Sequence, residues 1–370
     1  MKIALVVPGG VDRSGEIRVI PVLVALLGRL AAQHSVHVFA THQEATRGDW
    51  LLEGAHVHNL GLPHSAWRTA NAIVAEHRKQ RFDLIQAFWI GRHTAAAIGA
   101  ATLLRVPALV HVAGGELVAL PDIGYGGCLT WRGRALTGAV LRRAAQVTCA
   151  STPVVEHIAR AGVEAQRVPL GVDLERWPPR APTRRRASEP PRLVHIASLN
   201  AVKDQPTLLR ALRLLTDEGR DFHLDLIGED TLGGRIQAMA AQLGLTQRVT
   251  FHGFLTQRAL RPIVEAAHIA LITSRHETGP VALLEAALAG VPTAGTAVGH
   301  IAEWSPHAAL AVPCQDPAAL AGALVTMLDD EDLRLRLAGE AQRRAELENA
   351  DYTARAFNDI YRRVTANAMA

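Results

Sequence analysis

Cysteine is scarce in this chain, whose 370 residues include only Cys128, Cys149 and Cys314. Because the three are odd in number and far apart in the sequence, they form neither a disulfide framework nor a CxxC metal pair. This usage favours a reducing, cytoplasmic compartment. Aromatic residues make up only 4%, whereas hydrophobic residues as a whole make up 49%. That composition is typical of a globular protein in which helices pack on buried strands.

Long hydrophobic runs are also missing. Nowhere do about 18 uncharged apolar residues follow one another, so no membrane-spanning helix is expected. The N-terminus, MKIALVVPGG, has one lysine and a five-residue apolar run before Pro8, which is shorter than the apolar region of a signal peptide. We therefore expect this run to form a buried first strand.

The sequence has no HExxH motif, no zinc-finger spacing and no basic run interleaved with aromatic residues. It therefore predicts neither a metal held by protein ligands nor binding to nucleic acid. The net charge is +4, and two interpretations of it stay open. Either arginine serves as a solvated surface residue, or the positive charge attracts an anionic partner such as a nucleoside diphosphate or an acidic membrane surface.

Short apolar runs alternate with longer amphipathic stretches along the chain. In the first half the runs are KIALVV, SVHVFA, DLIQAF, PALVHVA and QVTCAS. In the second half they include RLVHIAS, FHLDLIG, RVTFHG and HIALITS. Such alternation predicts an α/β protein with parallel, doubly wound sheets.

The segment from Trp177 to Arg192 interrupts this alternation. Proline and arginine dominate it and it has no apolar face, so it predicts a linker over residues 178–191. Residues 1–177 and 192–349 then form two domains. Because ligands of such sheets bind at the carboxyl ends of the strands, we expect a cleft between the two domains to hold the site.

The segment from Ser274 to His300 is the most informative part of the sequence. It follows the predicted strand HIALIT and opens a helix near Gly279 or Pro280. The free N–H groups and partial positive charge of a helix N-terminus suit a diphosphate. Glu277 in the loop and Glu285 in the helix could hold the hydroxyl groups of a sugar and of a ribose.

In this segment the sequence resembles the GT-B glycosyltransferases of family 4. ETGPVALLE reproduces that family's pair of glutamates separated by seven residues, and the match continues through EAALAGVP. The resemblance implies that Glu277 contacts the donor sugar and Glu285 the ribose diol. It also places Thr278, Gly279, Pro280 and Val281 around the diphosphate, with backbone N–H groups offered by Gly279, Val281 and Ala282 but not by Pro280.

HIASLNAVKDQPTLLRAL resembles a second motif of the family, in which an arginine and a lysine neutralise the departing diphosphate. Lys203 matches the lysine, whereas Ser198 stands where the family has arginine. Arg275, close to Glu277 in sequence, is a candidate substitute for that arginine. VTFHGF resembles the strand and turn over which the nucleotide base stacks, which implies a donor contact at Phe254.

The first half carries weaker matches. VPGGVDRSGE resembles the family's N-terminal glycine loop, which implies donor contacts at Gly9 and Gly10. LVHVAGGELVALPDIGYGG has Ala113-Gly114 where the family often has His-Gly, so His111 becomes the candidate catalytic histidine, with a satisfied core residue as the alternative. The loop that follows suggests acceptor contacts at Glu116 and Tyr125. ADYTARAFNDIY resembles a helix, residues 350–370, that crosses back to the first domain.

The resemblance implies two Rossmann-like domains of the GT-B type and a retaining transfer of a hexose from a nucleoside diphosphate sugar, UDP favoured over GDP. The acceptor is a hydroxyl group of a sugar, a lipid or a small molecule. No cofactor beyond the donor and no metal is expected. Two alternatives stay open, a non-catalytic GT-B relative that binds a nucleotide sugar as a partner subunit, and a sugar-nucleotide epimerase. A cytoplasmic protein is expected, with peripheral membrane contact and the oligomeric state left open.

Overall fold

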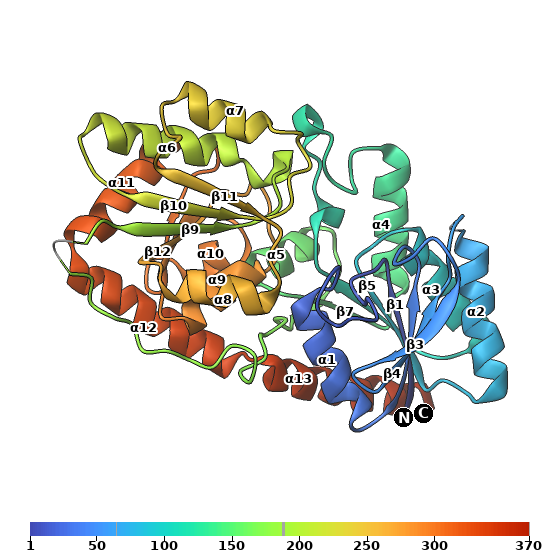
Figure 1. Cartoon of the computed structure of the whole chain (residues 1–370). Helices are drawn as coiled ribbons and strands as arrows, with labels where there is room; N and C mark the ends of the chain where they lie inside the picture. The colour runs from blue at the N-terminus through green and yellow to red at the C-terminus, as the bar shows by residue number, and fades with distance from the viewer. Residues whose placement is uncertain (64, 187–188, 370) are drawn as a thin grey trace. The chain divides into compact units, whose positions relative to one another are not determined.

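The computed structural model describes residues 1–63, 65–186 and 189–369, and it divides the chain into two compact units (Figure 1). The first unit comprises Met1–Asp173 and Glu348–Ala370, and the second comprises Leu174–Leu347. Each unit has its own sheet and its own hydrophobic core. Among the described residues, no helix combines the length and the apolar character that crossing a bilayer requires.

Within its described residues, the first unit contains an eight-stranded sheet in the order β3-β4-β2-β1-β5-β6-β7-β8. Its pairs are parallel except β3 with β4. The elements are β1 (Lys2–Val7), α1 (Pro21–Ala31), β2 (Ser35–Ala40), β3 (Gly48–Leu52), β4 (Ala55–Asn59), α2 (Ala66–Lys79), β5 (Leu84–Phe88), α3 (Arg92–Leu104), β6 (Ala108–Val112), η1 (Gly115–Leu117), η2 (Pro121–Ile123), α4 (Trp131–Arg143), β7 (Gln146–Cys149), α5 (Thr152–Arg160), β8 (Ala165–Arg167) and α13 (Ala350–Met369).

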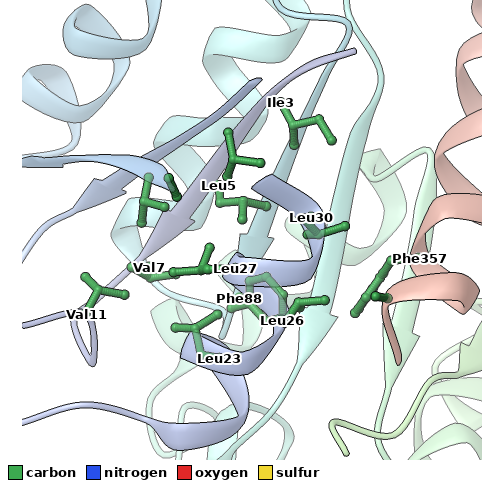
Figure 2. Close-up of a cluster of buried hydrophobic side chains, with 14 of the residues drawn as sticks. Ile3, Leu5, Val7, Val11, Leu23, Leu26, Leu27, Leu30, Phe88 and Phe357 are labelled. Atoms are coloured by element: carbon green, nitrogen blue, oxygen red, sulfur yellow. The ribbon is translucent and has the colours of Figure 1, made fainter. Parts of the chain in front are cut away.

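The core of the first unit explains why β1 is apolar from Ile3 to Val7. All six of its residues are buried, because helices cover both faces of the strand. Figure 2 shows one of these faces, where alternate side chains of β1 meet α1, Phe88 and Phe357. Phe357 belongs to α13, so the last helix of the chain completes the core around the first strand. Burying each such side chain contributes about 1.5–3 kcal/mol.

The second unit contains a six-stranded parallel sheet in the order β11-β10-β9-β12-β13-β14, again within its described residues. Figure 1 shows α6 and α7 over one face of it and α8 and α9 over the other. The elements are β9 (Arg192–Ile196), η3 (Ala201–Lys203), α6 (Gln205–Asp217), β10 (His223–Ile227), α7 (Arg235–Gln242), β11 (Val249–Gly253), α8 (Gln257–Glu265), β12 (Ile269–Ile272), α9 (Val281–Leu288), β13 (Thr293–Thr296), α10 (Gly299–Trp304), β14 (Ala309–Val312), α11 (Pro317–Asp329) and α12 (Glu331–Leu347).

The strand order of the second unit reverses between β9 and β12. From β9 the chain continues outward through β10 and β11, and it then returns to the other side of β9 to form β12, β13 and β14. At such a reversal the loops leaving two neighbouring strands turn to opposite faces of the sheet. The space between them is where ligands bind in open parallel sheets.

The predicted linker, residues 178–191, lies within the second unit, whose boundary with the first falls between Asp173 and Leu174. The Arg180 N–H donates to the Leu288 carbonyl at 2.8 Å, and the Arg185 side chain donates to the Leu328 carbonyl at 3.2 Å. The Arg334 guanidinium donates to the Thr183 carbonyl at 2.6 Å. The described part of this segment is thus extended chain held against α9, α11 and α12, although residues 187 and 188 lie outside the description.

Candidate functional site

The site is built on the two loops that leave β9 and β12. The loop after β9 carries Ser198 and reaches Lys203 through the short helix η3, and the loop after β12 carries Glu277 and leads into α9. Both strands are buried at their centres. Because β9 and β12 are parallel neighbours, their loops leave the same edge of the sheet.

Lys203 and Glu277 meet across these loops. The Lys203 Nζ lies 2.5 Å from Glu277 Oε1, and the side chains are 26% and 14% exposed. The Ser274 hydroxyl donates to the same carboxylate oxygen at 2.6 Å. A partly screened pair of this kind adds little to stability, but it places a cation and a carboxylate at one point with solvent access.

Backbone hydrogen bonds fix this placement. The Arg275 N–H donates to the Val202 carbonyl at 2.7 Å, and the Thr273 hydroxyl donates to the Lys203 carbonyl at 2.8 Å. The Asn200 side chain accepts the Lys203 N–H at 3.2 Å. The two loops are therefore joined through main-chain atoms, so the position of Lys203 beside Glu277 does not depend on the two side chains alone.

Two glycines allow the close backbone approaches that surround these loops. Gly228 has a φ of +153°, and a Cβ there would lie 2.0 Å from the Ala197 carbonyl oxygen, beside Ser198. Gly299 has a φ of +49°, and its Cβ would lie 2.9 Å from the Glu277 carbonyl oxygen. Any side chain at either position would displace the loop it touches.

The helix α9 begins beside Glu277, as the sequence predicts. Pro280 is its N-cap residue, without a side-chain cap, and Val281 is the first helical residue. The first N–H groups of a helix have no partner inside it, and no acidic residue lies in the first turn. The partial positive charge of this end therefore adds to the charge of Lys203 on the same loop system.

Glu285 lies in the buried part of α9, with 3% of its surface exposed. Burial raises the pKa of its carboxyl group to about 7, and a hydrogen bond from Gln257 opposes this shift. The Gln257 Nε2 donates to Glu285 Oε1 at 2.8 Å, while Trp177 Nε1 donates to Gln257 Oε1 at 2.5 Å. Trp177 thus orients the amide that faces Glu285, a contact that the sequence analysis missed.

The remaining residues predicted around the donor lie in loops of the second unit. Ser198 is exposed, and its carbonyl accepts from Gln205 Nε2 at 3.1 Å. Phe254 follows β11 and is 56% exposed. Arg275 lies near enough to Asp204 to oppose the rise that burial causes in the pKa of that carboxyl group. Its role as a substitute for the family's arginine stays a prediction.

The glycine loop of the first unit is closed by Gln43. The N–H groups of Gly10 and Val11 both donate to Gln43 Oε1, at 2.8 and 2.9 Å. Gly9 lies against the same side chain. The loop therefore does cluster backbone N–H groups, as a glycine loop should, but a side chain of the protein accepts two of them.

The prediction of His111 as a catalytic residue is corrected by its burial. The side chain has no exposed surface, and its Nδ1 lies 2.9 Å from the Thr148 hydroxyl. Its ring packs against Phe88 and Phe357, and burial lowers its pKa to about 3. A neutral ring covered by α13 cannot touch a substrate, so His111 is a core residue, although its buried Nε2 has no hydrogen-bond partner among the described residues and the residue is not fully satisfied.

The predicted acceptor contact at Glu116 is corrected as well, whereas the one at Tyr125 stays a prediction. The Glu116 carboxylate accepts the N–H groups of Ile90, Ala113 and Gly114, at 3.1, 3.2 and 2.7 Å, and its side chain is buried. The Tyr125 ring lies so close to Gly115 that a Cβ there would be 2.5 Å from it. Glu116 therefore ties its own loop to the loop after β5, and the partly exposed Tyr125 packs against the Glu116 loop at Gly115.

The raised pKa of Glu285 predicts a pH-dependent stability. Between the ordinary value of 4.5 and about 7 the folded protein binds more protons than the unfolded chain, so stability falls as pH rises through this window. Glu285→Gln removes the titration and should stabilise the protein at pH 8 by about 2–3 kcal/mol more than at pH 5. Urea denaturation at both pH values measures this. The exposed Glu218→Gln should show no such difference, and an equal effect of Glu285→Gln at both pH values would contradict the assignment.

Comparison with protein families accounts for most of the chain. Residues 19–172 match the glycosyl transferase 4-like domain, and residues 181–344 match glycosyl transferases group 1. Over 208 residues the chain is 31% identical to a GDP-mannose-dependent alpha-(1-6)-phosphatidylinositol dimannoside mannosyltransferase of Mycobacterium tuberculosis, covering 54% of this chain and 53% of that protein. Over 343 residues it is 26% identical to a glycogen synthase of the same species, covering 87% and 81%.

For several of the curated relatives it matches, the chain spans only about half of their length, as with the mannosyltransferase at 53%. Solved structures match over nearly the whole chain. Sucrose-phosphate synthase from Thermosynechococcus elongatus superposes with a TM-score of 0.80 at 20% identity, covering 99% of this chain and 100% of that one. The Anabaena protein HepE, solved in complex with UDP-glucose, gives 0.74 at 18% identity, covering 97% and 99%. The two family matches and this shared architecture show that the chain belongs to the group 1 glycosyltransferases and has their GT-B fold.

Proposed function

We propose that this chain transfers a hexose from a nucleoside diphosphate sugar to a hydroxyl acceptor, with retention of the anomeric configuration. The observation that carries the proposal is the pairing of Lys203 with Glu277 beside the start of α9. A cation, a carboxylate and a helix N-terminus at one point are what a sugar joined to a diphosphate requires. Membership of the group 1 family supports the same reaction.

Lys203 and the start of α9 stabilise the negative charge of the leaving diphosphate. As the bond from the sugar's anomeric carbon to the diphosphate breaks, negative charge builds on the phosphate oxygens. Fixed donors aimed at such charge supply a large part of catalysis. The Lys203 ammonium and the backbone N–H groups at Gly279, Val281 and Ala282 are the donors, and Ser198 contributes no charge where the family has arginine.

Glu277 and Glu285 hold the donor. The Glu277 carboxylate accepts hydrogen bonds from hydroxyl groups of the sugar. These bonds hold the anomeric carbon, and the diphosphate attached to it, close to Lys203. The Glu285 carboxylate accepts hydrogen bonds from the ribose diol, which takes the place of the Gln257 amide that Glu285 binds in this structure. The acceptor oxygen then attacks from the face that the diphosphate leaves, and its proton passes to a phosphate oxygen. This route needs no protein nucleophile and no metal.

The nucleotide base is proposed as uracil, with guanine as the alternative. Structures of HepE contain UDP, UDP with glucose, or UDP-glucose, whereas the mannosyltransferase relative uses GDP-mannose. Phe254 is exposed next to β11 and offers a flat surface to either base. The choice between them rests on these comparisons.

Incubation with a panel of UDP- and GDP-hexoses and a mixed set of hydroxyl acceptors tests the function. We expect acceptor-dependent release of the nucleoside diphosphate and, by NMR, a product with the anomeric configuration of the donor. Tight binding without release would instead indicate a non-catalytic relative. Interconversion of the sugar nucleotide without an acceptor would indicate an epimerase, and either result would overturn the proposal.

The proposal assigns different parts of the donor to the two glutamates. Glu277→Ala should lose most turnover without weakening binding of the bare nucleoside diphosphate, because its carboxylate touches only the sugar and its loss frees Lys203. Glu285→Ala should weaken that binding by about 1–3 kcal/mol, through a lost hydrogen bond to the ribose. Calorimetry with UDP and GDP measures both, with the exposed Glu218→Ala as the control. Equal losses of affinity would show that the division of roles is wrong.

A further inference from the structure

The first unit gathers two histidines and a glutamate between its sheet and α2. His37 lies on β2, His58 on β4 and Glu76 on α2. Each offers one ligand atom, and the three atoms lie within 4.8 Å of one another. This group shares no residue with the predicted donor contacts, most of which lie in the second unit.

The spacing of the three atoms fits a tetrahedral ion. His37 Nδ1 is 3.0 Å from His58 Nε2 and 3.7 Å from Glu76 Oε1. Zinc bonds to histidine nitrogen and carboxylate oxygen are about 2.0–2.2 Å long, so ligand atoms around zinc are about 3.3 Å apart. These two separations lie on either side of that value, whereas the His58 and Glu76 ligand atoms lie within 4.8 Å of each other and would have to close by up to about 1.5 Å on an ion.

The hydrogen bonds that His58 and His37 make away from the cluster bear on which ring nitrogens can bind an ion. His58 Nδ1 lies 2.6 Å from Asp49 Oδ1, so the ring donates its proton there and leaves Nε2 as an acceptor. With His58 Nε2 as the acceptor, His37 Nδ1–H donates to it at 3.0 Å. A metal ion would displace that proton, and His37 Nε2, 3.4 Å from the Ser35 hydroxyl, can take it up and donate there, which leaves Nδ1 free to bind the ion. A carboxylate that orients a histidine from behind is the usual support of a metal ligand.

The charged side chains around the cluster determine how tightly we expect it to bind a metal ion. Glu76 Oε1 also pairs with the Lys2 ammonium at 2.8 Å, and Lys79 pairs with the other oxygen at 2.8 Å. A carboxylate oxygen has two lone pairs, so Oε1 can accept Lys2 and an ion together. The two lysines nevertheless oppose a cation, so binding should be of micromolar rather than nanomolar strength.

We propose that His37, His58 and Glu76 bind a divalent transition-metal ion such as Zn²⁺. Two imidazoles and one carboxylate suit zinc and its neighbours rather than Mg²⁺ or Ca²⁺, which prefer oxygen ligands. A cavity of about 780 Å³, lined in part by Asp49, His58 and Glu76 but not by His37, leaves room beside the cluster for water as a fourth ligand, although Arg47, Arg68 and Lys79 also line it. An ion there would tie β2, β4 and α2 together.

The test is zinc binding by the full chain after chelation and desalting. Titration calorimetry should show one saturable Zn²⁺ per chain, and zinc should raise the thermal midpoint. His58→Asn removes a ligand atom and should lower the zinc affinity by at least about tenfold. Asp49→Asn leaves all three ligands in place and should lower it about 10- to 100-fold. It serves as the second variant if His58→Asn does not fold.

His56→Asn is the matched control, because His56 lies on the same strand and stacks on His37 but offers no ligand atom to the cluster. It should bind zinc as the wild type does. Absence of saturable binding by the wild type, or unchanged affinity in His58→Asn or Asp49→Asn, would overturn the proposal. A thiolate-to-metal band in the Co²⁺ spectrum would place the ion on a cysteine and would also overturn it.

Discussion

The second unit's candidate site depends on hydrogen bonds that join the loop after β9 to the loop after β12 and so bring Lys203 against Glu277. The two side chains come from loops on either side of the strand-order reversal, and two hydrogen bonds join these loops, from the Arg275 N–H to the Val202 carbonyl and from the Thr273 hydroxyl to the Lys203 carbonyl. A pair exposed to this degree contributes little to folding. Because the ion pair is weak, a bound donor can displace it at small cost. The diphosphate then takes the place of Glu277 beside Lys203, and sugar hydroxyl groups take the place of Lys203 beside Glu277.

Other features of the second unit position the loops that carry Lys203 and Glu277. The parallel strands β9 and β12 bring both loops to one edge of the sheet. Gly228 and Gly299 permit backbone approaches that no side chain would allow. Burial of Glu285 in α9, with Gln257 and Trp177 behind it, stores a carboxyl group whose pKa is raised to about 7. A ribose diol that donates hydrogen bonds to the ionised carboxylate of Glu285 would lower this pKa.

Much of the fold could be predicted from the sequence because its central strands are buried on both faces and read as apolar runs. The strands β3, β4 and β8 went unpredicted, since they are short, lie toward the sheet edges and have half-exposed, mixed sequences. The start of α9 beside Glu277 was also predictable, because it depends on local spacing alone.

The errors in the site have a common physical reason. A strand's two-residue period shows which face His111 lies on but not that α13, from the other end of the chain, covers that face. Glu116 is an acidic residue, yet its carboxylate accepts two N–H groups of its own loop, at Ala113 and Gly114, and the N–H of Ile90 from the loop after β5. The pairing of Gln257 with Glu285 and the cluster of His37, His58 and Glu76 join residues from separate elements, so no spacing in the sequence marks them.

The most direct test is the turnover of Lys203→Met with the preferred donor and acceptor. If Lys203 stabilises the departing diphosphate, kcat for its release should fall about 10²–10³-fold, the loss typical of removing one donor to developing negative charge. Thermal stability should change little, because the ion pair is partly exposed. A variant that stays folded and releases the nucleoside diphosphate at the wild-type rate would contradict the central role given to this lysine.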